Sequence, residues 1–414
     1  MAKILILTAA YGEGHNSAAR ALQRAFNELP GVEAELVDLF ALRAPRLNNL
    51  SRRGYLQLIN LAPKIWSLLY HWLDRSPRAP LMFRPLASHR RLLGRLLAEK
   101  QPVALVSTYP VYSWLLNQLR REGQVICPQY TVITDALSIN SLWYRSPSDG
   151  WFVTDHDSAA LLRANGVPVG KVYVSGFPVS LAFADRPPYW QPPDPSASPE
   201  RRILFMINSG RRHAVAIARA LLPHPHWHVT FTAGRDETLR QELVDLARGA
   251  SAQAEVLGWT DRIPELLMTH HVVISKAGGA TTQESINAIC PLLVSQIVPG
   301  QEEGNCELIR RHDAGALAET PQEIVAMLQR VFAHDARLWQ HWRANLSKLA
   351  RPGAARDIAA TVLQQAGLPA ATGSVSVSPE SPPLPASALP AAFTAAPAAP
   401  AAYVYYSLTN RSAY

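Results

Sequence analysis

The sequence predicts an α/β protein with two doubly wound domains, each built on a parallel sheet. The chain has 414 residues, of which 48% are apolar, enough for two cores of roughly 150–200 residues each. Short apolar strands alternate with helical patterns along most of the chain, and a proline-rich break near the middle separates two such series. Charged residues make up only 17%, below the roughly 25% of an average soluble protein, which favours a surface with apolar contacts.

The first series opens as strand, loop and helix. Residues 3–8 form an apolar strand, and apolar residues at helical spacing follow from about Asn16. A strand at 34–39 completes a β-α-β unit, which implies a parallel sheet with a right-handed crossover. Further strands are expected at 103–107, 129–134, 150–154 and 171–175.

The break at residues 185–200 contains six prolines and has no apolar periodicity, as is typical of a linker. After it, strands are expected at 202–208, 227–232, 255–257, 272–275 and 292–295. We therefore predict domains at 1–184 and 201–368, with the ligand site between the carboxyl ends of their strands. Residues 369–414, rich in Ala, Pro and Ser, predict a disordered tail.

Several classes of protein are excluded. Three cysteines without close spacing argue against a disulfide framework or a zinc site. No apolar run reaches the ~18 residues that a spanning helix needs, and the start lacks the pattern of a signal peptide. These features favour a protein of the reducing cytoplasm.

The net charge of +8 is concentrated between residues 51 and 95, where nine basic residues face one acid, Asp74. Aromatic residues lie among leucines in the same stretch, notably Tyr55, Trp66, Tyr70 and Trp72. An apolar surface flanked by arginines is how an interfacial helix meets anionic lipid; the alternative is a core helix with a solvated basic side. Nucleic acid fits less well, because the aromatics do not alternate with basic residues.

Residues 11–17 (YGEGHNS) join the first strand to the first helix. Gly12 and Gly14 would expose backbone amides at a helix N-terminus, where negative charge is favoured. His15 would face the interdomain cleft as a general base. The alternative is a dinucleotide-binding loop with Asp38 as its acidic residue, and this motif alone does not distinguish the two.

The second half contains two polar turns, SKAGGATTQE at 275–284 and PGQEEGN at 299–305. Glu284, on the first turns of a helix, could accept hydrogen bonds from the vicinal hydroxyls of a ribose. Gln301 and Glu302 could bind the hydroxyls of a hexose. Together the two turns favour a nucleotide-sugar site.

The chain resembles a known family through the motifs YGEGHNSAA, TDALSINSLW, VSGFPV, LGWTDRIPELL, SKAGGATTQES and VPGQEEGN. In order and spacing over residues 3–365, they look like glycosyltransferase family 28. Within it, they are most similar to the branch of monogalactosyldiacylglycerol synthases and processive diacylglycerol glucosyltransferases. The resemblance implies the GT-B fold, a UDP-activated hexose, inversion at the anomeric carbon and no requirement for a metal or other cofactor.

The resemblance also implies roles for individual residues. His15 matches the base that deprotonates the acceptor, Glu284 the carboxylate that holds the ribose, and Gln301 with Glu302 the pair that binds the donor sugar. Asp135 matches an acidic position of the acceptor domain, as base partner, acceptor contact or structural cap. Gly14, Gly278 and Gly279 match positions that bind the diphosphate. Trp259 and Thr260 match the loop that binds uracil.

The loop after the first strand of the second domain departs from the family pattern. It reads NSGRRH at 208–213, where relatives usually have more glycines. We expect Gly210 and Arg211 to contact the diphosphate there, with Arg211 and Arg212 replacing backbone amides. The alternatives are that these bulkier residues displace the donor, or that the two arginines are simply exposed.

We therefore expect an enzyme that moves glucose or galactose from UDP-glucose or UDP-galactose to diacylglycerol or a related lipid, peripheral on the inner face of the cell membrane. The motifs do not distinguish the two hexoses. Alternatives are a transferase of the UDP-GlcNAc type, a UDP-sugar epimerase, an NAD-linked oxidoreductase and a non-catalytic nucleotide-sugar-binding protein.

Overall fold

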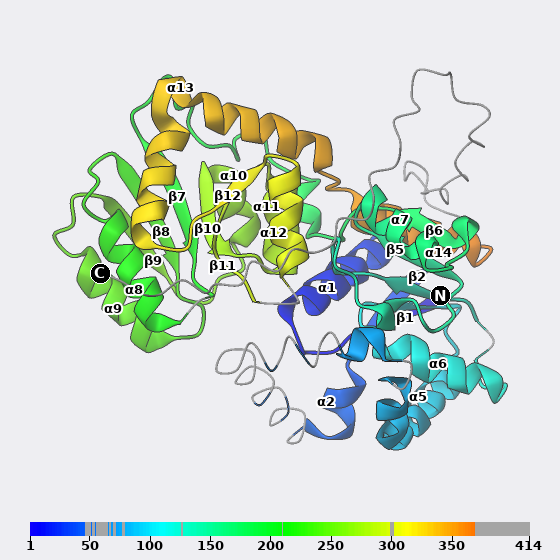
Figure 1. Ribbon diagram of the computed structural model, residues 1–414. Coiled ribbons are helices and arrows are strands. Elements are labelled where there is room, and N and C mark those ends of the chain that lie inside the picture. Colours follow the sequence, from blue (N-terminus) through cyan, green and yellow to red (C-terminus); the bar gives the residue numbers. More distant parts are fainter. Residues whose placement is uncertain are drawn as a thin grey trace, which may run out of the picture. The chain divides into compact units, whose positions relative to one another are not determined.

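The computed structural model describes residues 1–45, 51, 54, 65, 68, 72–76, 79–125, 127–208, 210–298 and 302–368. Within these residues the chain forms two six-stranded sheets, in which all neighbouring strands are parallel (Figure 1). The predicted α/β class with two doubly wound domains is thereby confirmed. The predicted tail lies outside the described residues.

The first sheet has the strand order β2-β1-β3-β4-β5-β6. Its strands are β1 (Ala2–Leu7), β2 (Val32–Val37), β3 (Ala104–Ser107), β4 (Gln129–Val132), β5 (Gly150–Val153) and β6 (Val172–Val174). The associated helices are α1 (Glu13–Asn27), α2 (Leu39–Arg43), α5 (Ala87–Lys100), α6 (Val111–Arg121) and α7 (His156–Ala164). Short 3-10 turns are η1 (Ala79–Leu86), η2 (Ser141–Trp143), η3 (Val169–Lys171) and η4 (Leu181–Phe183).

The second sheet has the strand order β12-β11-β10-β7-β8-β9. Its strands are β7 (Arg201–Met206), β8 (Trp227–Thr232), β9 (Gln253–Leu257), β10 (Val272–Lys276), β11 (Leu292–Gln296) and β12 (Gly315–Leu317). The helices of this half are α8 (Arg211–Leu221), α9 (Glu237–Ala247), α10 (Ile263–Thr269), α11 (Gly279–Ala288), α12 (Glu303–Arg311), α13 (Pro321–Leu349) and α14 (Ala354–Gln365).

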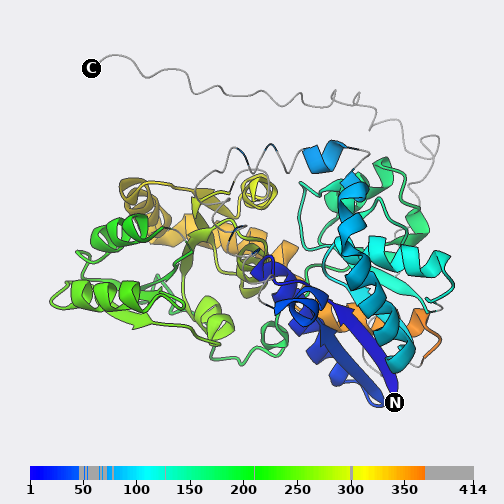
Figure 2. The ribbon, with the colours of Figure 1, turned by 90° about the horizontal axis from the view of Figure 1, so that it is seen from below.

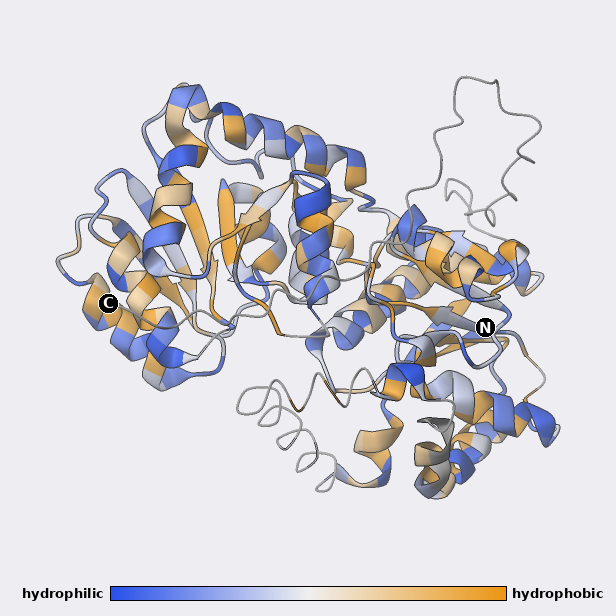
Figure 3. Cartoon of the chain, in the orientation of Figure 1, coloured by the Kyte–Doolittle hydropathy of each residue, from blue (hydrophilic) through white to orange (hydrophobic). Residues whose placement is uncertain are grey.

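The central strands are buried on both faces, as parallel sheets require. Residues Ile4–Leu7 of β1 and Val272–Ile274 of β10 are almost completely buried, and the strands are apolar while the helices turn polar residues outward (Figure 3). Continuous apolar runs, instead of alternating ones, are therefore the correct signal for these strands.

The last helix packs with the first sheet although it follows the second in sequence. Ile358 and Val362 of α14 are buried in the same core as Ile4 and Phe26. Arg356 of this helix forms ion pairs with Glu28, the C-cap residue of α1, at 2.8 Å and with Asp185 at 2.7 Å. The predicted range 201–368 thus includes a helix that completes the first core, because α14 offers an apolar face that this core buries.

The order of the strands reverses between β1 and β3 in the first sheet, and between β7 and β10 in the second. Ligands bind at such points in open α/β sheets, beyond the carboxyl ends of the strands. Here the loop after β1 leads into α1, and the loop after β10 leads into α11. Figure 2 shows the two halves from below, with α1 between the two sheets.

The two halves approach closely through the motifs that the sequence singled out. A Cβ atom added at Gly304, at the start of α12, would overlap the carbonyl oxygen of Ala136 in the loop after β4. One added at Gly279 would lie 3.4 Å from the carbonyl oxygen of Thr134. Glycine is therefore required at position 304 by packing, because a larger residue would prevent this contact between the two halves.

Candidate active site

A cavity of about 590 Å³ lies between the two sheets and is lined by residues of both halves. From the first half come the glycine–histidine loop, the residues of α1 after it, and Thr134 and Asp135 after β4. From the second half come Lys276 at the end of β10, the start of α11, and Glu302 before α12. The predicted position of the site is thereby matched by a real cavity.

Two helices begin at this cavity, and neither start has a side-chain cap. Gly12 is the N-cap residue of α1 and Gly278 that of α11, and no side chain caps either helix. The first amide groups of a helix have no partner within it and carry a partial positive charge. A Cβ atom at Gly14 would lie 3.7 Å from the amide nitrogen of Ala280, so the two helix starts are close together. This arrangement suits an anion such as a diphosphate.

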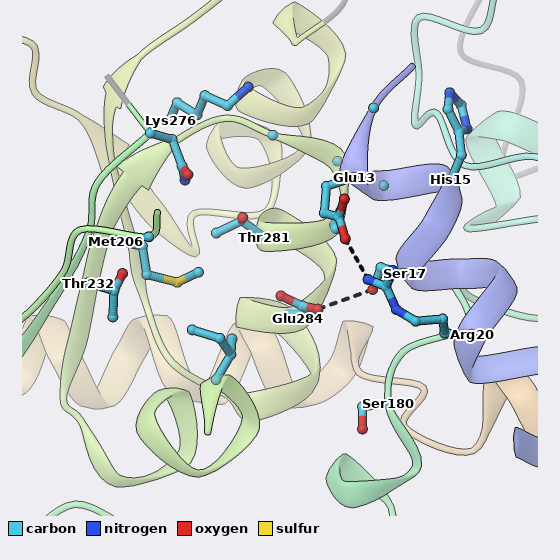
Figure 4. Close-up of a pocket in the computed structure, with 18 of the residues that line it drawn as sticks. Glu13, His15, Ser17, Arg20, Ser180, Met206, Thr232, Lys276, Thr281 and Glu284 are labelled. Carbon is cyan, nitrogen blue, oxygen red and sulfur yellow. Dashed lines mark hydrogen bonds and ion pairs between the residues drawn. The ribbon is translucent and has the colours of Figure 1, made fainter. Parts of the chain in front are cut away.

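Glu284 extends from α11 into the cavity (Figure 4). Its carboxylate accepts a hydrogen bond from the hydroxyl of Ser17 on α1 at 3.4 Å. Burial raises the pKa of Glu284 to about 7, and the Ser17 hydrogen bond opposes this shift only in part. A half-buried carboxylate with one weak partner is suited to accept hydrogen bonds from ligand hydroxyls.

His15 lies on the other side of the α1 start from Glu284 (Figure 4). Its Nδ1 lies 2.9 Å from the hydroxyl oxygen of Thr134, and its ring packs between Tyr109 and Trp143. Burial lowers the pKa of His15 to about 4, so the imidazole is neutral near pH 7. If Nδ1 donates its proton to Thr134, the lone pair of Nε2 is the basic atom.

Asp135 does not hydrogen-bond to His15. Its Oδ2 accepts a hydrogen bond from the indole nitrogen of Trp143 at 2.7 Å, and burial raises its pKa to about 6. Of the three roles left open from the sequence, the structural one has a visible contact, because Asp135 fixes the tryptophan that packs on His15.

Lys276 and Glu302 form an ion pair at the edge of the cavity. Lys276 Nζ lies 2.5 Å from Glu302 Oε1, and Glu302 Oε2 accepts a hydrogen bond from the amide of Val298 at 3.0 Å. Both carboxylate oxygens of Glu302 are therefore engaged by the protein itself.

The other predicted residues divide into three groups. Gly14, Gly278, Gly279, Trp259 and Thr260 line the cavity. Gly210 and Arg211 do not: Arg211 forms an ion pair with Glu242 at 2.7 Å on the surface. The expected phosphate contact of Arg211 therefore has no support in the structure, because α8 directs this side chain to α9. Gln301, Tyr55, Trp66 and Tyr70 lie outside the described residues.

The dinucleotide interpretation is contradicted at Asp38. Its carboxylate caps α2 by accepting hydrogen bonds from the amides of Phe40 and Ala41 and also bonds the amide of Ala10. Asp38 does not line the cavity, so it is not available to a ribose there.

Three residues of the site lie within the quoted motifs but were given no role from the sequence: Thr134, Lys276 and Ser17. Thr134 and Lys276 each lie at or just after the carboxyl end of a strand. The position of polar residues at strand ends could have identified both. The Ser17 contact joins residues 267 positions apart and leaves no local signal.

In the ranges that the structure describes, no group of three or more His, Cys, Asp and Glu side chains could hold a metal ion. Among the same residues, no helix has the length and apolarity needed to cross a bilayer.

Solved structures with the same fold include complexes with UDP and with UDP-2fluoro-glucose. The structure of S. aureus MnaA with UDP matches with a TM-score of 0.57 and 12% identity, over 91% of this chain and 100% of that one. Phytolacca americana UGT2, complexed with UDP-2fluoro-glucose and pterostilbene, matches with a TM-score of 0.58 and 13% identity, over 89% of this chain and 100% of that one. At these identities the likeness shows the fold alone, which is the predicted GT-B fold.

The sequence comparisons then point to one branch. A family model described as monogalactosyldiacylglycerol (MGDG) synthase matches residues 15–179. A processive diacylglycerol beta-glucosyltransferase of Bacillus mycoides (strain KBAB4) is 25% identical over 371 residues, 88% of this chain and 94% of that protein. One of Bacillus cereus (strain ATCC 14579) is 25% identical over 355 residues, 82% of this chain and 87% of that protein. The resemblance to this branch of glycosyltransferase family 28 is confirmed.

The raised pKa of Glu284 predicts a pH-dependent stability. An unfolded glutamate ionises near pH 4.3, whereas folded Glu284 keeps its proton up to about pH 7. Its contribution to stability is therefore complete below pH 4.3 and is lost as the pH rises toward 7. In Glu284→Gln this loss is absent, so the variant should gain ~2 kcal/mol relative to wild type between pH 5 and pH 8. Thermal denaturation at both pH values measures it, with exposed Glu33→Gln as the control. If the difference in Tm between Glu284→Gln and wild type is the same at pH 5 and at pH 8, the pKa of Glu284 is not raised.

The contact between Thr134 and His15 predicts a fixed tautomer. We expect one dominant tautomer, protonated at Nδ1, in the wild type and in Thr134→Ser, and a mixture in Thr134→Val, where no oxygen accepts the proton. The ¹⁵N chemical shifts of the His15 ring report this directly. If Thr134→Val gives the wild-type shifts, Thr134 does not hold the ring.

Proposed function

We propose that the protein is an inverting glycosyltransferase that moves a hexose, glucose or galactose, from a UDP-sugar to the hydroxyl of diacylglycerol or a related lipid, forming a β-glycolipid. One observation above all supports this: His15 from one half and Glu284 from the other line the same cavity, on either side of two uncapped helix starts. The names of the relatives, all processive diacylglycerol beta-glucosyltransferases, support the same substrates.

The donor fits the second half. Glu284 accepts hydrogen bonds from the ribose hydroxyls, and the start of α11 faces the diphosphate. Trp259 lines the cavity and is 64% exposed, with the guanidinium of Arg235 over its ring at 4.6 Å. The exposed indole ring of Trp259 can support the uracil ring. The backbone amides stabilise the negative charge that develops on the leaving UDP.

The chemistry is a single displacement. The acceptor oxygen attacks the anomeric carbon from the face opposite the UDP oxygen, the bond to UDP breaks, and the acceptor proton moves to Nε2 of His15. Because burial disfavours the charged imidazole, this transfer becomes favourable as negative charge develops on the diphosphate in the same cavity. His15 is thus suited to act while the leaving group departs, and not before.

The acceptor fits the first half. Between residues 42 and 82, the described residues with large exposed apolar side chains are Leu42, Ile65, Leu68, Trp72 and Met82. The segment 72–76 is hydrogen-bonded to a turn beside the site, because Asp74 Oδ1 accepts a hydrogen bond from the amide of Ser141 at 2.6 Å. Ser141 begins the turn η2, which ends at Trp143, the ring that packs on His15. Exposed apolar side chains on a segment joined to the base in this way suit a lipid acceptor at an anionic membrane surface.

The substitution His15→Ala tests this function. We expect glycolipid formation to fall at least a hundredfold, since general bases contribute ~10²–10⁴-fold, while UDP still binds. The assay combines the full chain, diacylglycerol vesicles and either UDP-glucose or UDP-galactose, with products identified by mass spectrometry. His341→Ala, an exposed histidine on α13, is the control.

Retained turnover in His15→Ala would remove His15 from the mechanism. A wild-type protein that binds UDP but forms no glycolipid would favour the non-catalytic alternative. A changed sugar without a lipid product would favour an epimerase, a class whose fold this chain shares.

A further inference from the structure

We infer that Lys276 is the side chain that binds the diphosphate of the donor, and that Glu302 positions this lysine without contacting the sugar. This inference rests on the proposed function, because it takes a nucleoside diphosphate as the ligand. It assigns a role to a residue of the motif SKAGGATTQE that was given none from the sequence, and it changes the role expected of Glu302.

Lys276 lies where the diphosphate is expected. It ends β10, and Ala277 and Gly278 connect it to α11. Its Nζ would lie 3.9 Å from a Cβ atom added at Gly278, the N-cap residue of that helix. Figure 4 shows the side chain extending from the second sheet toward the start of α1. The ammonium group therefore stands beside the uncapped amides of α11, where the partial charges of the helix add to its own.

The other described cations of the cavity are less suitable. Arg20 is engaged by Glu13 at 2.6 Å. Arg24 lies eleven residues into α1, ~16 Å from its start at a rise of 1.5 Å per residue. Arg211, expected from the sequence to meet the phosphates, pairs with Glu242 outside the cavity. Among the described residues, Lys276 is thus the cation placed at the helix starts.

Lys276 and Glu302 differ in how much of each side chain is exposed, and this difference indicates different roles. The side chain of Lys276 is 31% exposed and that of Glu302 only 7%, so a ligand in the cavity meets the lysine first. One oxygen of Glu302 holds Nζ and the other holds the amide of Val298. Each oxygen of Glu302 already accepts one hydrogen bond from the protein, and its side chain is nearly buried, so a sugar hydroxyl has little access to this carboxylate. Among the described residues, Glu302 is the one hydrogen-bond partner of this ammonium, which leaves two of its N–H groups for phosphate oxygens.

Binding of UDP and uridine to the full chain, measured by calorimetry or by competition, tests Lys276. In Lys276→Met we expect UDP to bind at least tenfold more weakly, while uridine, which lacks phosphates, binds within twofold of wild type. Lys276→Arg keeps the charge and should retain more UDP affinity than Lys276→Met. The control is Lys348→Met, which removes a lysine on α13 outside the cavity.

Two results in Lys276→Met would overturn the inference: an unchanged affinity for UDP, or an equal loss of affinity for UDP and for uridine. Either result would leave the proposed function intact. A wild-type protein that binds no UDP would overturn the proposed function and the inference with it.

Glu302→Gln tests the second part, because UDP and UDP-glucose differ only by the sugar. If Glu302 acts through Lys276, the affinities for both ligands change by the same factor. If UDP-glucose binding weakens while UDP binding does not, Glu302 contacts the sugar and its positioning role is wrong.

Discussion

Two helices from different sheets start at the same cavity without side-chain caps, and the rest of the site depends on this. The amides of α1 and α11 have no partner within their helices, and the close approach of Gly14 to Ala280 directs both starts at one place. Unpaired buried amides are costly unless a ligand or water satisfies them. The functional groups then divide by helix: α1 presents His15 and Ser17, and α11 presents Glu284, with Lys276 just before it.

The same constraint relates burial to chemistry. The lowered pKa of His15 and the raised pKa of Glu284 both follow mainly from burial, and for Glu284 the hydrogen bond from Ser17 and the charge of Arg20 offset it only in part. In the proposed reaction the bound donor supplies a partner to each group. The ribose hydroxyls donate hydrogen bonds to Glu284, and the negative charge of the leaving diphosphate stabilises the protonated ring of His15. Groups with perturbed pKa values on opposite sides of one cavity are typical of functional sites.

Much of this could be predicted from the sequence because it is local. The apolar runs and the helical spacing predicted both sheets, and the glycine loops predicted the helix starts at the cavity. The α1 helix begins at Glu13, slightly earlier than the apolar pattern indicated, because Gly12 and not Asn16 precedes its first turn. The short edge strand β12 was missed, since three residues give too little periodicity to recognise.

What could not be predicted depends on contacts between distant residues. The pairing of Lys276 with Glu302, and of Arg211 with Glu242, is decided by the direction of each side chain, which motif spacing does not report. The return of α14 to the first core is likewise invisible, since an amphipathic helix does not state which core it joins. For the same reason Asp135 remained ambiguous until Trp143 was found against it.

A crystal structure of the complex with UDP would show where the nucleotide lies. We expect the ribose at Glu284, the diphosphate at the start of α11, and an open space next to the β-phosphate that His15 faces. A nucleotide bound outside the cavity between the two sheets, or one whose diphosphate points away from α11 and leaves His15 remote from it, would show that this site does not bind the donor as proposed.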